Sequence, residues 1–192
     1  MMKKSTLSAG LILLASPALA HPGHGFGFGY GMVHPLLGAD HLLAMLAVGL
    51  WSGFALPRKL WLGAAVFLSA MVAGAVLVWA DIALPQIEAL LLASVLVFGV
   101  LVLCAKPDQA HWVKAASLLA IAGFAACHGQ AHALEATGNV TLYLAGFLLA
   151  TTALHLAGIA LARRVAASPA ADLVQRLLGG AVAASGLYLM VG

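Results

Sequence analysis

His34-Pro35-Leu36-Leu37-Gly38-Ala39-Asp40-His41 leads directly into the apolar stretch 42–54. Two imidazoles and a carboxylate therefore stand at the mouth of a hydrophobic segment that is long enough to cross a bilayer. Polar groups are costly in that position unless they pair with one another or bind a ligand. Polar residues of other segments that reach the same depth would be their natural partners.

The composition of the chain is that of a polytopic membrane protein. Of the 192 residues, 64% are hydrophobic and 8% are charged, and the mean hydropathy is +1.07, well outside the range of soluble domains. The apolar segments run for about 20 residues without alternating polarity, which favours spanning helices over a membrane β-barrel. The basic residues are spread along the chain in pairs, so they predict topology and not a nucleic-acid partner.

The first 32 residues are expected to form an export signal and an arm. Residues 1–20 combine two lysines, a short apolar stretch and an Ala-Leu-Ala ending, which predicts a signal peptide cleaved after Ala20; a retained anchor helix is the alternative. Residues 21–32 are rich in glycine, which disfavours an isolated helix, so we expect a flexible or ligand-ordered arm. Its His21 and His24 either capture a transition metal or belong to a mobile tail.

Residues 33–192 predict an all-α bundle of six transmembrane helices whose sequential members pack antiparallel. The expected spans are 33–54, 61–80, 86–105, 112–133, 140–162 and 173–191. Every Lys and Arg after the signal falls in or beside the first, third and fifth connections, whereas the second and fourth carry only acidic charges. The positive-inside rule then places both termini on the outer side of the membrane.

The first polar cluster lies at the outer end of the first span. Pro35 suits the first turn of a helix, which would make His34 a cap-like residue. In a straight helix His34 and His41 share a face but lie about 10 Å apart. Either the backbone breaks near Gly38, or the two histidines serve successive positions along a route. Asp40 is either a ligand from an adjacent face or an acceptor that orients an imidazole.

A second polar cluster ends the fourth span. His128, His132 and Glu135 are spaced i, i+4 and i+7, so they form one stripe of a helix. This stripe reaches the same side of the membrane as the first cluster. Imidazole and carboxylate together suit Ni²⁺, Co²⁺ or Zn²⁺, and the two clusters together favour a metal site over structural pairing within either one.

Other residues of the spans have two interpretations each. Glu88, near the outer start of the third span, either joins the site or lies at the membrane interface. His155, deeper in the fifth span, is either a second station for an ion or the donor of an interhelical hydrogen bond. Cys104 and Cys127 lie in apolar runs, which predicts small buried side chains.

These motifs resemble the HupE/UreJ family of nickel/cobalt permeases. The first-helix signature of that family is similar to residues 34–41 with the following 43–51, and its fourth-helix signature resembles residues 128–132 with Glu135. The chain departs from the family pattern at Cys127, where an aromatic residue is usual and where sulfur becomes a candidate ligand, and at Ala133, where glycine is usual. The resemblance implies metal handling by His34, Asp40, His41, His128, His132 and Glu135.

Together with the motifs, this resemblance implies a bacterial inner-membrane permease, with both termini and its metal site facing the periplasm, that takes up Ni²⁺ or Co²⁺ for a hydrogenase or urease, or for cobalamin synthesis. The chain has no Gly-x-x-x-x-Gly-Lys-Ser/Thr motif, so transport is expected to be secondary or facilitated unless a separate ATPase partner exists. We expect neither enzymatic activity nor a prosthetic group. One rival is a redox protein with bis-histidine haem. Another is a membrane metal sensor or assembly factor that does not transport. The choice of metal, the energy coupling and the oligomeric state, a homo-oligomer included, are left open.

Overall fold

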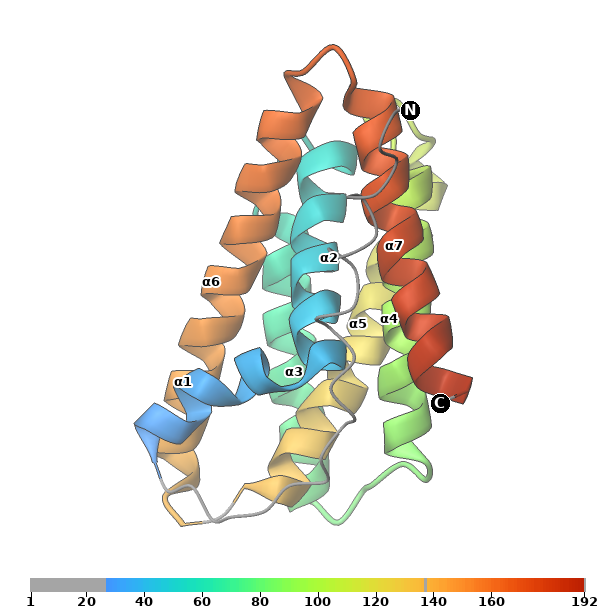
Figure 1. Ribbon diagram of the computed structural model, residues 1–192. Coiled ribbons are helices and arrows are strands. Elements are labelled where there is room, and N and C mark those ends of the chain that lie inside the picture. Colours follow the sequence, from blue (N-terminus) through green and yellow to red (C-terminus); the bar gives the residue numbers. More distant parts are fainter. Residues whose placement is uncertain (1–26, 137, 192) are drawn as a thin grey trace, which may run out of the picture.

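A computed structural model describes residues 27–136 and 138–191 of the chain, and within them every regular element is a helix. Figure 1 shows long helices packed side by side, with one short helix lying across an end of the bundle. Five helices are long and apolar enough to cross a membrane, and the first two together form a bent sixth candidate. The helices are α1 (Phe28–Leu37), α2 (Ala39–Ala55), α3 (Leu62–Trp79), α4 (Ile87–Cys104), α5 (His111–Glu135), α6 (Val140–Ala166) and α7 (Ala171–Val191). The all-α, multi-pass prediction is confirmed.

The expected first span over residues 33–54 is broken into two helices, which is one of the two alternatives that the sequence left open. The backbone breaks at Gly38, whose φ of −91° and ψ of 122° are extended, and α1 and α2 meet at 85°. Pro35 lies inside α1 and not in a first turn; because it has no N–H, it weakens the last turn of that helix. Beyond the break, Asp40 in the first turn of α2 favours a new helix start through the helix dipole.

Helix α1 begins at Phe28, inside the segment that was expected to be a flexible or ligand-ordered arm. Tertiary packing outweighs the low helix propensity of its glycines. A Cβ atom at Gly31 would collide with the carbonyl oxygen of Tyr143 on α6, and one at Gly146 of α6 would collide with the carbonyl oxygen of Phe28. The missing side chains let the two backbones touch. The expected signal peptide, His21 and His24 lie outside the described residues.

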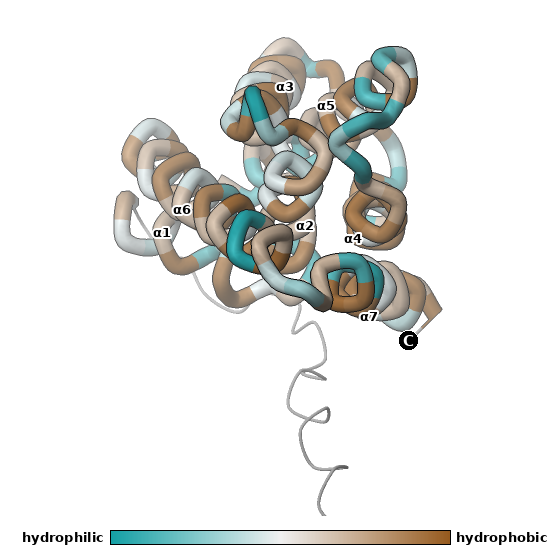
Figure 2. Tube along the Cα trace, turned by 90° about the horizontal axis from the view of Figure 1, so that it is seen from above, coloured by the Kyte–Doolittle hydropathy of each residue, from teal (hydrophilic) through white to brown (hydrophobic). Residues whose placement is uncertain are grey.

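Helix α2 is the centre of the bundle. Of its 17 residues, 12 are buried, and it contacts α1, α3, α4, α6 and α7; Figure 2 shows it among these neighbours, seen along the bundle. Gly49 of α2 and Gly158 of α6 lie against each other's helix so closely that neither has room for a Cβ atom. Helices on the periphery instead expose leucines and valines, as expected of surfaces that face lipid.

Charge separates the two ends of the bundle. The start of α2, the end of α5 and the C-terminal end of α7 lie at one end, which we call the histidine end (Figure 1). The opposite, basic end carries all seven Lys and Arg residues of the described chain: Arg58, Lys59, Lys106, Lys114, Arg163, Arg164 and Arg176. Cys104, also at the basic end, is exposed and corrects the expectation of a buried side chain, whereas Cys127 is buried as predicted.

Two neighbouring glycines of α1 test how that helix is held. Gly31→Ala must push α1 away from α6, which should cost about 1–3 kcal/mol, as overpacking does, and lower the melting temperature of the detergent-purified protein. Gly29 is the matched control, because a Cβ atom there meets nothing within 4 Å. Equal melting temperatures for the Gly29→Ala and Gly31→Ala variants would contradict this packing.

Candidate metal centre

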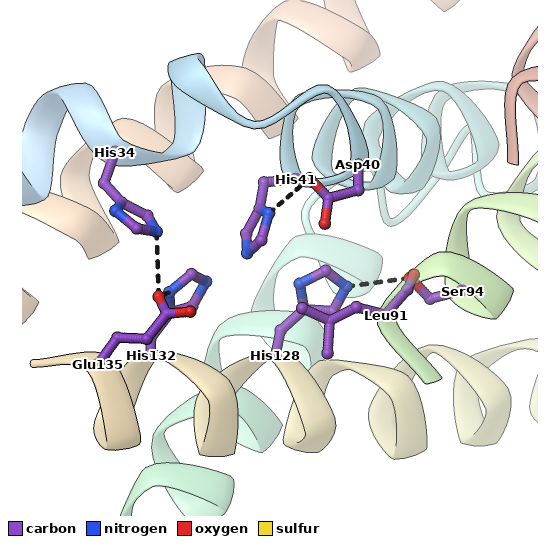
Figure 3. A network of polar contacts seen from close by, with 8 residues as sticks. All are labelled: His34, Asp40, His41, Leu91, Ser94, His128, His132 and Glu135. Atoms are coloured by element: carbon purple, nitrogen blue, oxygen red, sulfur yellow. Dashed lines mark hydrogen bonds and ion pairs between the residues drawn. The ribbon is translucent and has the colours of Figure 1, made fainter. Parts of the chain in front are cut away.

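Three histidines from three helices meet at the histidine end. His34 comes from α1, His41 from the first turn of α2 and His132 from the last turns of α5 (Figure 3). Each offers one ring nitrogen, and these three atoms all lie within 4.8 Å of one another. Donor atoms around one ion with bonds of about 2.1 Å lie about 3–4 Å apart, so small side-chain rotations would bring all three onto a single ion.

The break at Gly38 brings the two histidines of the first motif together. A straight helix would hold His34 and His41 about 10 Å apart, whereas their ring centroids are 5.7 Å apart here. The His132 ring lies 4.9 Å from the ring of His34 and 4.6 Å from that of His41. The backbone break near Gly38, one of the two alternatives that the sequence left open, is therefore the one found in the structure.

Asp40 orients its neighbour His41. Because a carboxylate only accepts, His41 Nδ1–H donates to Asp40 Oδ1 at 2.9 Å. The other ring nitrogen, Nε2, is buried without a hydrogen-bond partner among the described residues. Gly38 makes room for this pair, since a Cβ atom there would lie 2.8 Å from Asp40 Oδ1 and 3.0 Å from His41 Nδ1. Asp40 thus fixes a tautomer whose lone pair is available to a metal.

His128 repeats the arrangement one turn deeper on α5. The Ser94 hydroxyl on α4 donates to the Leu91 carbonyl oxygen, so it accepts from His128 Nε2–H at 3.0 Å. The Nδ1 atom of His128 is buried without a partner among the described residues, and its ring lies 5.2 Å from that of His41. His128 stands next to the three close histidines, on the side away from Glu135 (Figure 3).

Glu135 lies at the rim of the cluster and is 44% exposed. Its Oε2 atom lies 3.6 Å from His34 Nε2 and 3.8 Å from His132 Nδ1. The stripe of His128, His132 and Glu135 therefore faces His34 and His41, as Figure 3 shows. A carboxylate in this place can compensate the charge of a cation that arrives from the bundle end.

The remaining candidates lie elsewhere. Glu88 is exposed in the first turn of α4 and is not part of the close histidine group. Cys127 packs in a small apolar cluster with Leu91 and Ala131. His155 Nδ1–H donates to the Met45 carbonyl oxygen of α2 at 2.7 Å, which is the predicted interhelical hydrogen bond.

Several side chains of the site were not predicted from the sequence. Phe147 of α6 lies with its ring centroid 4.0 Å from that of His132, and Tyr143 lies 5.9 Å from His34. Ser94 carries the one hydroxyl in the apolar run of α4. The sequence could therefore indicate a polar role for Ser94, but it could not identify His128 as the partner. The rings of Tyr30, His41, His132 and Tyr143 pack edge-on around His34.

Comparison with known proteins agrees with these motifs. The sequence matches the family described as HupE / UreJ protein over residues 9–189. The chain belongs to this family. Protein HupE of Rhizobium leguminosarum bv. viciae is 38% identical to it over 199 residues, covering 100% of both chains. No solved structure matches.

The matched region covers every described residue of this HupE/UreJ chain except the last two, Met190 and Val191. It therefore contains both polar motifs and the helices that position them. The roles of single residues rest on the geometry described above.

Asp40→Asn tests whether the carboxylate orients a metal ligand. The variant keeps the size of the side chain but removes its charge, and we expect it to weaken Ni²⁺ binding to the purified protein by about 10–100-fold, as loss of such partners does. Asp81→Asn is the matched control. Asp81 is an exposed loop carboxylate at a positive φ of 59°, which asparagine also tolerates. Equal affinities for the two variants would rule out the orienting role.

Proposed function

We propose that this chain is a permease that takes up Ni²⁺ or Co²⁺ across the bacterial inner membrane. The observation that carries the proposal is the group of three buried imidazoles whose nitrogens converge within 4.8 Å at one end of a membrane bundle. Neutral imidazole is a favoured ligand of late first-row divalent metals. Membership of the HupE/UreJ family supports the same function.

The charge asymmetry supports an orientation for this uptake. With the basic end in the cytoplasm, as the positive-inside rule requires, the histidine end and its acidic residues face the periplasm. A hydrated cation would then meet Glu135 at the rim before it reaches the buried histidines. Exchange of its waters for imidazole nitrogens would select transition metals over Mg²⁺ and Ca²⁺, which prefer oxygen ligands.

The chain supplies binding and passage, and the energy source is proposed to be an ion gradient or the metal gradient itself. The cargo would serve assembly of a metalloenzyme such as a hydrogenase or urease, or cobalamin synthesis. Zn²⁺ would compete at the same nitrogens, since its ligand preferences overlap. A sensor or assembly factor would bind the metal without moving it, and the first experiment below separates the two.

Uptake of radioactive Ni²⁺ into proteoliposomes that contain the purified chain tests the proposal directly. We expect time-dependent uptake by the wild type and a reduction of at least about tenfold in the His34→Ala, His41→Ala and His132→Ala variants, because each removes one ligand. His111→Ala is the matched control, since His111 is exposed at the basic end of α5. Metal binding by the wild type without uptake would identify a sensor or assembly factor instead.

The external pH should also control uptake. Protons compete with the metal for imidazole nitrogens, so we expect the initial rate to fall as the external pH drops from about 7.5 to about 5.5. The measurement is the initial rate at saturating and at limiting Ni²⁺, with the internal pH held constant. Competition predicts a rise in KM on acidification, and a rate independent of pH over this range would argue against histidine ligation.

A further inference from the structure

His155 lies deeper in the bundle than the candidate metal centre. It is fully buried, and it follows the first residue of α6 by 15 positions, which is about 22 Å of helix. Its Nδ1–H donates to the Met45 carbonyl oxygen, one turn beyond His41 on α2. Its Nε2 atom is left with a lone pair and no hydrogen-bond partner among the described residues.

His155 thus repeats the design of His41 and His128. In all three, an acceptor holds one ring nitrogen and the buried second nitrogen is unpartnered within the described chain: the acceptors are the Asp40 carboxylate, the Ser94 hydroxyl and the Met45 carbonyl. Buried polar atoms are nearly always paired in native proteins. The same unpaired ring nitrogen in three buried histidines indicates that these nitrogens bind a common ligand.

Phe67 of α3 contacts both the inner histidine and the outer cluster. Its ring centroid lies 5.7 Å from the ring of His128 and 4.9 Å from the ring of His155, and its side chain is fully buried. The ring is therefore a direct neighbour of both imidazoles. A cation that moves from one imidazole to the other would therefore meet this ring.

Two hydroxyls mark the same route. Thr151 Oγ1 lies one turn from His155 on the same face of α6, towards the histidine end, and Ser52 Oγ lies further along α2 towards the basic end. Both atoms are buried without a hydrogen-bond partner in the described part of the chain. Hydroxyl oxygens that lack a partner keep lone pairs that could accept a passing cation.

We propose that His155 Nε2 is an inner relay ligand for the transported divalent cation and that Phe67 is the gate between it and His128. This inference rests on the proposed uptake function and locates the path that uptake follows. The ion leaves His128 Nδ1, passes the displaced Phe67 ring and binds His155 Nε2 with water as its other ligands. One protein ligand keeps this binding weak, as conduction through successive sites requires.

His155→Asn separates relay from structure. The asparagine amide can still donate to the Met45 carbonyl oxygen, but the side chain ends before the position of Nε2. In proteoliposomes we expect the rate of Ni²⁺ uptake to fall by at least about tenfold, while the Ni²⁺ affinity of the purified variant stays close to that of the wild type because the outer histidines are intact. Unchanged affinity also shows that the variant is folded.

Three outcomes would overturn the proposal in distinguishable ways. Uptake by the His155→Asn variant at the wild-type rate would remove the relay and leave the permease function standing. Absence of uptake by the wild type itself would remove both. Loss of both Ni²⁺ affinity and uptake in the His155→Asn variant would show that His155 supports the fold of the outer centre and is not a relay.

Phe67→Leu tests the gate independently. The shorter side chain should open the space between His128 and His155 and raise the initial uptake rate several-fold over that of the wild type. Phe98→Leu is the matched control: Phe98 is also buried, and its ring packs on Phe67 and Phe124. A rate for Phe67→Leu that equals or falls below that of Phe98→Leu would contradict a gating role.

Discussion

The extended backbone at Gly38 is the constraint on which the candidate site depends. It turns α1 by 85° away from α2, so that His34 is carried back over the end of the bundle towards His132. No residue with a Cβ atom fits there without displacing the Asp40–His41 pair. One glycine therefore fixes the path of the chain and leaves room for the hydrogen bond that orients a ligand. The packing of α1 on α6 through Gly31 and Gly146 holds the turned helix in place.

Burying several imidazoles inside a membrane bundle is costly, and the structure limits that cost in a specific way. Each of His41, His128 and His155 satisfies one nitrogen through a neighbouring acceptor and keeps the other available. A neutral imidazole is far easier to bury than a carboxylate, because only the charged form carries a large desolvation penalty. Neutral, pre-oriented imidazoles can thus stay buried in an apolar interior while no cation is bound. A cluster of carboxylates could not.

Sequence patterns predicted the helices, the end of the bundle at which the two motifs meet, and the shared face of His128, His132 and Glu135. They left the geometry of the first motif undecided. Helix periodicity alone does not show whether a helix continues through Pro35 and Gly38 or breaks there. The glycine-rich start of α1 was misjudged since propensity describes an isolated helix, whereas α6 provides the contact that stabilises it. Ser94, Phe67 and Phe147 could not be assigned from sequence, because their roles depend on which helices become neighbours.

The distribution of charge along the bundle suggests why ligands become sparser with depth. Asp40 and Glu135 stand beside the outer histidines, so a divalent cation there has carboxylates nearby to compensate its charge. Around His155 the polar groups are neutral: the Met45 carbonyl, Thr151 and, further on, Ser52. A cation should therefore dwell at the histidine end and cross the inner half quickly, since low-dielectric surroundings without a counter-charge disfavour it. Strong binding outside and weak binding inside would give selection and release from the same set of imidazoles.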